Sequence, residues 1–233
     1  MYTAAIIVAG GRGTRMGNAL PKQFLPLGGT PILMRTIEPF ITCSRIDEIV
    51  VVVPMENITE TKQLTAAFAP GKPVGVVPGG AKRQESVFQG LAALWPGCGV
   101  VVIHDAVRPF ITASLIAECV ETAERFGAAT VARPIKETVK AVEDGKVVET
   151  LDRSKLWIAQ TPQAFRAEII LRAHEQARLD GFLGTDDCML VERLGHPVHV
   201  IEGMDENIKI TTPVDLSIAG VILTLYERGG NGC

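Results

Sequence analysis

Apolar residues in this chain alternate between short continuous runs and longer stretches in which they recur at helical spacing. Continuous runs rich in valine and isoleucine are typical of strands that a sheet buries on both faces. Such runs predict strands at 4–8, 49–53, 75–77, 100–103, 128–132 and 197–201. Helical spacing predicts helices at about 31–40, 59–68, 83–94, 112–126, 167–179 and 213–226.

The alternation of strands and helices predicts a doubly wound α/β fold with a mostly parallel, Rossmann-like sheet. We expect one domain over 1–233, because no linker, internal repeat or low-complexity segment divides the chain. In such folds, ligands bind at the carboxyl ends of the strands. The segments that follow the predicted strands are therefore the first place to look for function.

The stretch 134–155 departs from this pattern, since it is polar and alternating around Asp144-Gly145. An Asp-Gly pair between alternating runs is a strong signal for a β hairpin. A hairpin here would project from the sheet rather than join it. Two interpretations remain open: a simple surface hairpin, or an arm that embraces a partner subunit.

The loop after the first predicted strand is basic and rich in glycine. It reads Gly10-Gly11-Arg12-Gly13-Thr14-Arg15-Met16, and Pro21-Lys22 follows. The first 37 residues contain four of the chain's 23 basic residues and no acid, whereas the remainder has 19 basic against 26 acidic residues. Backbone N–H groups and fixed cations suit a polyphosphate.

Three known nucleotide-binding loop patterns can be compared with this stretch. A Walker loop needs Gly-Lys-Ser/Thr at its end, but Gly13 is followed by Thr14-Arg15. A dinucleotide loop needs a third glycine where Met16 stands, which counts against a nicotinamide dehydrogenase. The nucleotidyltransferase pattern, Gly-x-Gly-x-Arg-Met followed by Pro-Lys, matches throughout. An ordinary turn with solvated arginines is the weaker alternative.

Two more clusters follow predicted strands. Around Gly79-Gly80, small residues would let a base or a ribose approach the backbone closely. After the run 100–103, His104 is more often structural than catalytic at such a place, and Asp105 can hold ribose hydroxyls or a hydrated Mg²⁺. Asp105 and Arg108 can also simply pair. Further polar clusters lie at 152–153, 160–163, 184–187 and 207–211.

Composition narrows the functional classes. A formal net charge of −3 argues against bulk nucleic-acid binding. No apolar run approaches the ~20 residues of a membrane span, and no signal peptide is expected. Five scattered cysteines form no Cys-x-x-Cys pair, so neither zinc nor a disulfide framework is supported. A reduced, cytoplasmic compartment is the simplest expectation.

Taken together, the motifs closely resemble those of the 2-C-methyl-D-erythritol 4-phosphate cytidylyltransferase family of the non-mevalonate isoprenoid pathway. The resemblance extends from about residue 4 to residue 219. It rests on ordered blocks: Gly-Arg-Gly-Thr-Arg-Met with Pro-Lys-Gln, Gly79-Gly80 with Arg83 and Ser86, His-Asp-Ala-Val-Arg-Pro, Leu-Asp-Arg, Gln-Thr-Pro-Gln, Gly-Thr-Asp-Asp and Asn-Ile-Lys-Ile-Thr.

The resemblance implies roles for individual residues. Arg15 and Lys22 match the pair that grips the triphosphate of CTP, and Asp105 matches a residue near the ribose and Mg²⁺. Arg153 and Lys209 match the pair that positions the sugar-alcohol phosphate. The remaining implied residues are, for the nucleotide, Ala9, Gly10, Gly11, Gly80, Arg83 and Ser86; for a homodimer arm that reaches the partner's site, Thr138; and for the pocket, Thr161 and Thr185.

The N-terminal block does not decide which sugar-alcohol phosphate is the acceptor substrate. The family often has Pro-Ala-Ala-Gly where this chain has Val8-Ala9-Gly10-Gly11, and the block also resembles ribitol 5-phosphate cytidylyltransferase. Leu151-Asp152-Arg153 and the Gly-Thr-Asp-Asp block favour methylerythritol phosphate. A non-catalytic nucleotide-binding regulator on the same fold would have no need of Lys22 or Arg153, so their presence counts against it.

Overall fold

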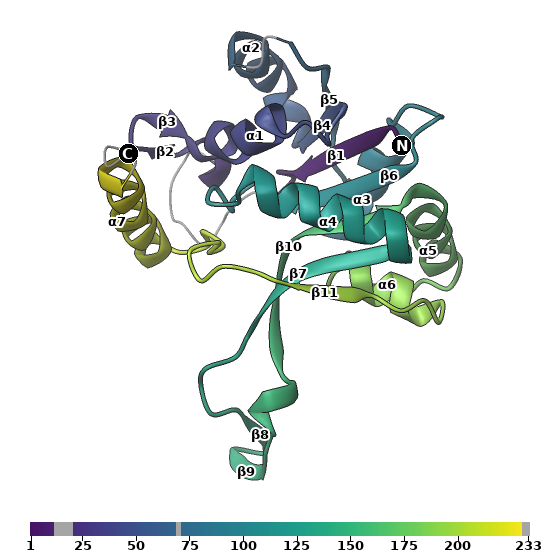
Figure 1. Cartoon of the computed structure of the whole chain (residues 1–233), viewed down its shortest axis with the longest axis vertical. Helices are drawn as coiled ribbons and strands as arrows, with labels where there is room; N and C mark the ends of the chain where they lie inside the picture. The colour runs from purple at the N-terminus through teal and green to yellow at the C-terminus, as the bar shows by residue number, and fades with distance from the viewer. Residues whose placement is uncertain (12–20, 69–70, 230–233) are drawn as a thin grey trace.

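A seven-stranded sheet forms the centre of the molecule, in the order β11-β7-β10-β6-β1-β4-β5 (Figure 1). The computed structural model describes residues 1–11, 21–68 and 71–229. Strand β10 is antiparallel to both of its neighbours, and the other pairings are parallel. The predicted mostly parallel sheet is thus confirmed. The strands are β1 (Thr3–Val8), β4 (Glu48–Val53), β5 (Val74–Pro78), β6 (Val100–Asp105), β7 (Ala128–Pro134), β10 (Trp157–Arg166) and β11 (His199–Glu202).

Helices cover both faces of this sheet, as a doubly wound fold requires. One face carries α1 (Ile32–Thr42), α2 (Ile58–Phe68) and α4 (Ala113–Phe126). The other carries α3 (Arg83–Ala92), α5 (Ala167–Leu179) and α6 (Asp187–Arg193). Helix α7 (Pro213–Gly229) packs beside the short pair β2 (Pro26–Leu27) and β3 (Thr30–Pro31). Within the described ranges, no helix has the length and apolar character needed to cross a bilayer.

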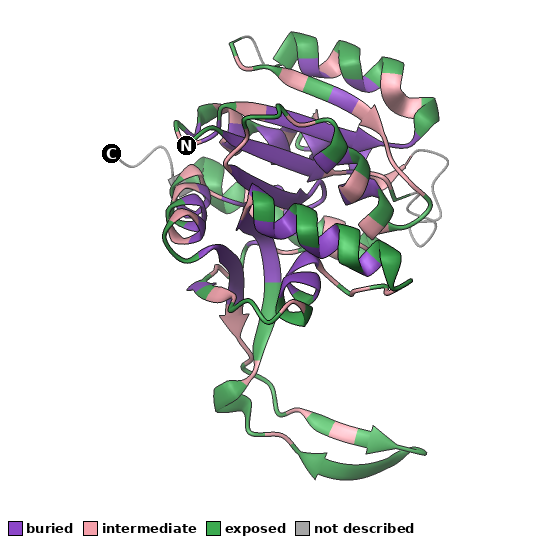
Figure 2. Ribbon diagram, turned by 90° about the vertical axis from the view of Figure 1, so that its right-hand side faces the viewer, coloured by how far each residue is buried: buried purple, intermediate pink, exposed green. Residues whose placement is uncertain are grey.

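The apolar runs form central strands because successive side chains point to opposite faces of the sheet and both faces are covered. In β1, Ile7 belongs to the core under α1 and α4, whereas Ile6 belongs to the core under α3 and α5. Val51 and Val52 of β4 divide between the same two cores. Figure 2 shows the sheet as the continuous buried layer of the molecule.

Two elements of the main fold, β10 and α6, were not predicted from the sequence, and neither was the short pair β2 and β3. The residues 160–163, which the sequence shows only as a polar cluster, lie inside β10, where Gln160, Thr161 and Gln163 are buried. The register of β10 against β7 shifts between Ala159 and Gln163, and this irregularity accommodates Pro162 within the strand. Helix α6 has seven residues, which is too short for a clear apolar period.

The hairpin expected at 134–155 is present. Strands β8 (Lys140–Glu143) and β9 (Lys146–Thr150) pair antiparallel, and Asp144 and Gly145 between them have φ of 47° and 75°. Positive φ at both central residues is the signature of a type I′ turn. The hairpin projects well away from the sheet and is mostly exposed (Figures 1 and 2), so its predicted separation from the sheet is confirmed.

The carboxyl ends of β1, β5 and β6 lie at one edge of the sheet. Val8 is in register with Asp105 of β6, and Val53 at the end of β4 is in register with Pro78 of β5. From β1 the chain passes through α1 on one face, and from β5 to β6 it passes through α3 on the other. The region beside β1 and β6 is therefore a topological switch point, where open α/β sheets bind ligands.

The close packing of α3 on the sheet depends on Gly90. A Cβ at this position would lie 2.6 Å from Cγ2 of Ile6 and 3.1 Å from Cγ2 of Val52. We therefore expect Gly90→Ala to lower the free energy of unfolding by about 1–3 kcal/mol, despite the better helix propensity of alanine. Equilibrium urea unfolding measures this change.

Gly220 of α7 is the matched control, because a Cβ there would meet no atom within 4 Å. Gly220→Ala should leave the free energy of unfolding unchanged or raise it by up to about 1 kcal/mol. Equal effects of the two substitutions would show that α3 is not tightly packed at Gly90.

Candidate active site

A cavity of about 250 Å³ opens at the switch point. We call it the β1 cavity, because the end of β1 forms one wall. Segments from three strand ends and from the 207–210 region converge on it, as the position of the strand ends predicts. The expected site residues that line it are Ala9, Gly10, Gly11, Lys22, Gly80, Arg83, Ser86, Asp105 and Lys209.

A second cavity of about 250 Å³ adjoins the first on the side of β10, and we call it the β10 cavity. Thr161 and Thr185, both expected in the pocket, line it. Arg83, Asp105 and Lys209 line both cavities. The two spaces therefore adjoin each other along one charged boundary.

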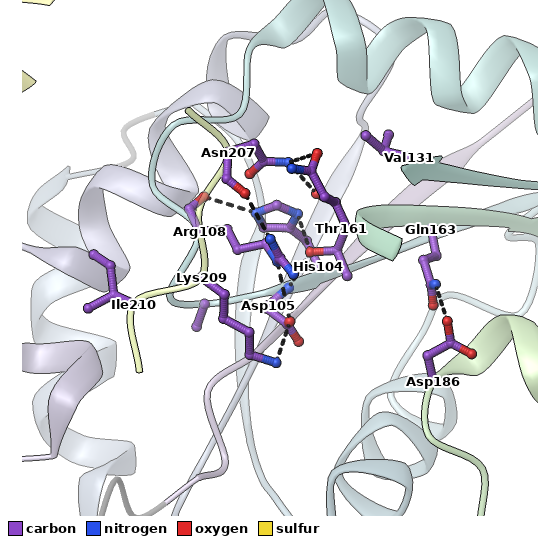
Figure 3. A network of polar contacts seen from close by, with 12 residues as sticks. His104, Asp105, Arg108, Val131, Thr161, Gln163, Asp186, Asn207, Lys209 and Ile210 are labelled. Atoms are coloured by element: carbon purple, nitrogen blue, oxygen red, sulfur yellow. Dashed lines mark hydrogen bonds and ion pairs between the residues drawn. The ribbon is translucent and has the colours of Figure 1, made fainter. Parts of the chain in front are cut away.

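Asp105 is the centre of that boundary (Figure 3). Its Oδ1 lies 3.2 Å from Nε of Arg83, and its Oδ2 lies 2.8 Å from Nζ of Lys209 and 3.5 Å from Nε of Arg108. Burial alone would raise the pKa of Asp105, but the positive charges of these three side chains hold that pKa well below its usual range. The carboxylate is therefore ionised at neutral pH.

Lys209 is placed by the packing of the segment around it. Asn207 and Ile210 on either side are fully buried, and the N–H of Ile210 donates to the carbonyl of Val107 over 2.9 Å. The side-chain amide of Asn207 donates to the carbonyl of Thr161 over 2.9 Å. The segment is thus tied to β10, and Lys209 is directed toward Asp105 (Figure 3).

Arg83 is held from its other side by Asp187, the first residue of α6. Nη1 of Arg83 lies 2.7 Å from Oδ2 of Asp187, and Oδ1 of Asp187 lies 3.0 Å from Nε2 of His174. Burial would raise the pKa of Asp187, and Arg83 and His174 lower it instead. The sequence shows Asp187 only as part of the polar cluster 184–187 and does not predict its contact with Arg83, because residues 104 positions apart give no local signal.

His104 does not line either cavity. Its side chain is fully buried, with Nδ1 3.0 Å from Oγ1 of Thr161 and Nε2 3.1 Å from the carbonyl of Arg108. Since a carbonyl only accepts, Nε2 carries the proton in the neutral ring. Burial lowers the pKa of His104 to about 4. This supports the interpretation of His104 as a structural residue.

Backbone also lines the β1 cavity, at Gly10 and Gly80. A Cβ on Gly10 would lie 2.7 Å from Oγ of Ser86, and a Cβ on Gly80 would lie 2.4 Å from Cβ of Glu85. The Ser86 hydroxyl accepts from the N–H of Gly80 over 3.1 Å. Ala9 already donates its N–H to the carbonyl of Val52, so it contributes wall rather than a free donor. Only glycine fits at these close approaches.

Of the expected catalytic cations, Lys22 lies in the β1 cavity, and Arg15 falls outside the described residues. Lys22 begins the short 3₁₀ helix η2 (Lys22–Phe24), and its Nζ donates to the carbonyl of Ile210 over 3.3 Å. This bond places Lys22 next to the segment that carries Lys209. Positive charge therefore gathers at the cavity of a chain that is acidic overall.

Arg153 and Thr138 lie on the projecting arm and line neither cavity of their own chain. Arg153 begins the short 3₁₀ helix η4 (Arg153–Lys155), and its Nη1 donates to the carbonyl of Lys136 over 2.8 Å. Thr138 is exposed. Within one chain, the structure does not bring Arg153 beside Lys209, the residue with which the sequence resemblance pairs it.

The residues present fit one kind of metal site. Among residues 1–11, 21–68 and 71–229, no three His, Cys, Asp or Glu side chains form a cluster that would hold a metal. Mg²⁺ commonly takes one or two carboxylates, with substrate phosphates and water as its other ligands. Asp105 at the boundary of the two cavities fits that arrangement, in which the phosphates bring most of the ligands.

An open α/β sheet with a glycine-walled, cation-bearing cleft at its switch point defines a nucleotide-binding α/β protein. The model of the family 2-C-methyl-D-erythritol 4-phosphate cytidylyltransferase matches residues 3–225. The chain belongs to this family.

Individual relatives agree with this assignment. The chain is 47% identical over 223 residues to the 2-C-methyl-D-erythritol 4-phosphate cytidylyltransferase of Geobacillus kaustophilus, covering 96% of this chain and 97% of the relative. It is 44% identical over 234 residues to the enzyme of that name from Pelotomaculum thermopropionicum, covering 97% and 98%. The crystal structure of the 4-diphosphocytidyl-2C-methyl-D-erythritol synthase of Anaerococcus prevotii superimposes with a TM-score of 0.86 at 31% identity, covering 96% and 98%.

The buried His104 gives the fold a defined pH dependence. Its pKa falls from 6.5 in the unfolded chain to about 4 in the fold, so between these values the unfolded state binds more protons. The contribution of His104 is fully present above pH 6.5 and is lost as the pH falls toward 4. We expect the free energy of unfolding to fall in this window by up to about 1.4 kcal/mol per pH unit from this group.

His104→Gln should reduce that slope, because glutamine can donate to the carbonyl of Arg108 but does not titrate. The comparison is between slopes, measured by urea unfolding at several pH values, and not between absolute stabilities. His196→Gln, at an exposed histidine, is the control and should keep the wild-type slope. An unchanged slope in the His104 variant would contradict the assignment.

Proposed function

We propose that this protein transfers CMP from CTP to 2-C-methyl-D-erythritol 4-phosphate in the cytoplasm. The products are 4-diphosphocytidyl-2-C-methyl-D-erythritol and pyrophosphate. The observation that carries this proposal is the pair of adjoining cavities with one shared boundary at Arg83, Asp105 and Lys209. Two phosphorylated molecules can lie side by side there. Membership of the cytidylyltransferase family supports the same reaction.

The proposed chemistry is an in-line displacement at the α-phosphorus of CTP. A phosphate oxygen of the acceptor forms the new P–O bond, and the bond between the α-phosphorus and the pyrophosphate oxygen breaks. The acceptor phosphate is largely dianionic at neutral pH, so it needs no protein base. A neutral, fully buried His104 agrees with a reaction that uses none.

Catalysis then consists of positioning and charge stabilisation. In this proposal, Arg15 and Lys22 bind the triphosphate, while Lys209 and Arg153 bind the acceptor phosphate. Two anions repel each other as they approach, so cations must flank both. The backbone at Gly10 and Gly80 gives the flat wall against which the cytosine would lie, with the Ser86 side chain beside it.

Mg²⁺ would be held beside Asp105, through water, and would neutralise charge on the triphosphate when bound. Because Asp105 also holds Arg83 and Lys209, it orients cations on both sides of the boundary. The protein's part is therefore to fix the two phosphates relative to one another.

The projecting arm suits a homodimer in which each arm reaches the partner's site. Val142, Val147 and Val148 on the arm are 55–61% exposed, so the arm presents apolar surface that a partner subunit could cover. Arg153 and Thr138 lie on the same arm, remote from both cavities of their own chain. A partner's site is where these two residues would act.

The acceptor is tested by measuring pyrophosphate release with CTP and either methylerythritol phosphate or ribitol 5-phosphate. Methylerythritol phosphate should be preferred by at least 10²-fold in kcat/KM, since the site must hydrogen-bond the acceptor's own hydroxyls. If ribitol 5-phosphate is preferred, the proposed acceptor is wrong but the transfer of CMP from CTP still holds. No release with either acceptor would leave a non-catalytic nucleotide-binding protein.

Lys22→Ala should act mainly on turnover. The charge of Lys22 would stabilise the phosphate oxygens as the pyrophosphate leaves, so kcat should fall on the order of 10²-fold or more. Steady-state kinetics with the preferred acceptor measure the change. Lys62→Ala, on α2 and outside both cavities, is the matched control and should match wild type. A normal kcat in the Lys22 variant would remove this residue from the mechanism.

Arg153→Ala should raise the KM for the acceptor and leave CTP binding nearly unchanged. Mixing this variant with Lys22→Ala then tests the arm. If arms cross, a mixed dimer holds one site with both residues intact, so random pairing restores about a quarter of wild-type activity. Activity no higher than that of the separate variants would place Arg153 in its own subunit's site, and equal loss of CTP affinity would refute its role with the acceptor.

A further inference from the structure

The buried pair of Asp187 and His174 has no part in the chemistry described so far. Each side chain is only 1% exposed, and Nε2 of His174 lies 3.0 Å from Oδ1 of Asp187. Burying a carboxylate is costly unless both of its oxygens are paired. The other oxygen, Oδ2, lies 2.7 Å from Nη1 of Arg83. The pair therefore meets the active site at one residue.

Arg83 is the residue through which such a pair could act. Its guanidinium contacts Asp187 through Nη1 and Asp105 through Nε, and it lines both the β1 cavity and the β10 cavity. A guanidinium held at two positions of its fork has a fixed plane, whereas one held at a single position can rotate. Removing the Asp187 contact would leave Arg83 tied only to Asp105.

We propose that Asp187 and His174 are positioning residues that fix the orientation of Arg83 at the boundary between the two substrates. The inference rests on the proposed cytidylyl transfer, because it assigns the pair to that reaction's site. His174 orients the Asp187 carboxylate, Asp187 orients Arg83, and Arg83 then meets Asp105 from a defined direction. Neither Asp187 nor His174 touches a substrate in this account.

Independent contacts keep the pair in place. The N–H of Asp187 donates to Oε1 of Gln163 over 3.2 Å, which fixes the start of α6 against β10. The His174 ring lies 6.5 Å from the ring of Phe88 on α3, the helix that begins with Arg83. Oε1 of Gln84, the next residue of α3, accepts a hydrogen bond from the N–H of Gly184 over 2.9 Å. Helices α3, α5 and α6 are thus joined around one salt bridge.

The consequence for catalysis is specific. An Arg83 released from Asp187 still carries its charge beside the cavities, so it can still attract a triphosphate. Its guanidinium would rotate toward the nearest phosphate instead of keeping one orientation between the two substrates. Loss of the pair should therefore lower kcat and spare the affinity for CTP.

The test compares two substitutions of His174. His174→Gln keeps a donor near the position of Nε2, and His174→Leu removes it with a similar volume. We expect His174→Leu to lower kcat by about 10-fold with the dissociation constant for CTP within about threefold of wild type. His174→Gln should keep kcat within about threefold. CTP binding by calorimetry and kcat, both per folded protein, are the readouts.

A double-mutant cycle separates positioning from a purely structural role. In an Arg83→Lys background, a lysine cannot meet Asp187 and Asp105 at once, so His174→Leu should have no further effect on kcat. If the losses of kcat from the two substitutions multiply in the double variant, the proposal is overturned. A His174→Leu variant that loses thermal stability but keeps wild-type kcat, or a His174→Gln variant as impaired as His174→Leu, would also overturn it.

Further variants keep the test decisive if His174→Leu does not fold. Asp187→Asn has nearly the same shape and should lower kcat at least as much as His174→Leu, again with CTP affinity preserved; wild-type kcat would refute the proposal. His196→Leu, at an exposed histidine, should have no effect. The assay of the wild-type protein tests the proposed function separately. Absence of CMP transfer by the wild-type protein refutes the proposed function. Transfer by the wild-type protein with unaffected variants refutes only the positioning role.

Discussion

A single buried carboxylate, Asp105, holds the candidate site together. It draws Arg83 from α3, Arg108 from the loop after β6 and Lys209 from the segment before α7 onto one point. Arg83 and Lys209 come from parts of the sequence distant from Asp105, and the three cations would repel one another without it. Because a buried charge is tolerated only when paired, the carboxylate and its partners fix each other's positions. This charge cluster forms the boundary between the two cavities.

The fold supplies the place for that cluster. The alternation of apolar runs buries β1, β4 and β6 on both faces, so their carboxyl ends form a rigid edge. Gly10 and Gly80 have no side chains that would obstruct a ligand at this edge. Gly90 brings α3 close enough for Arg83 to reach Asp105. Packing and charge thus place the same residues, and neither is sufficient alone.

The sequence predicted the central strands, most helices and the projecting hairpin, because these depend on local periodicity and on Asp144-Gly145. It also identified Lys22, Asp105 and Lys209 from motif blocks, and the structure brings these three to one cavity. It did not predict β10, since a proline among polar residues argues against a buried strand.

Asp187 and His174 also escaped sequence reasoning as parts of the site. Each stands in an ordinary helical context, and their meeting with Arg83 depends on how α3, α5 and α6 pack. Long-range pairing of charges leaves no periodic trace in the chain, so only the folded structure reveals it.

The most direct measurement of the central claim is the effect of Asp105→Asn on binding and turnover, each determined separately. The substitution keeps the shape of the side chain and removes the charge that orients Arg83 and Lys209. If the boundary works by positioning, kcat falls on the order of 10²-fold, a larger factor than the change in the dissociation constant for CTP, because the cations remain near the cavity. A variant that folds normally and turns over at the wild-type rate would contradict the account.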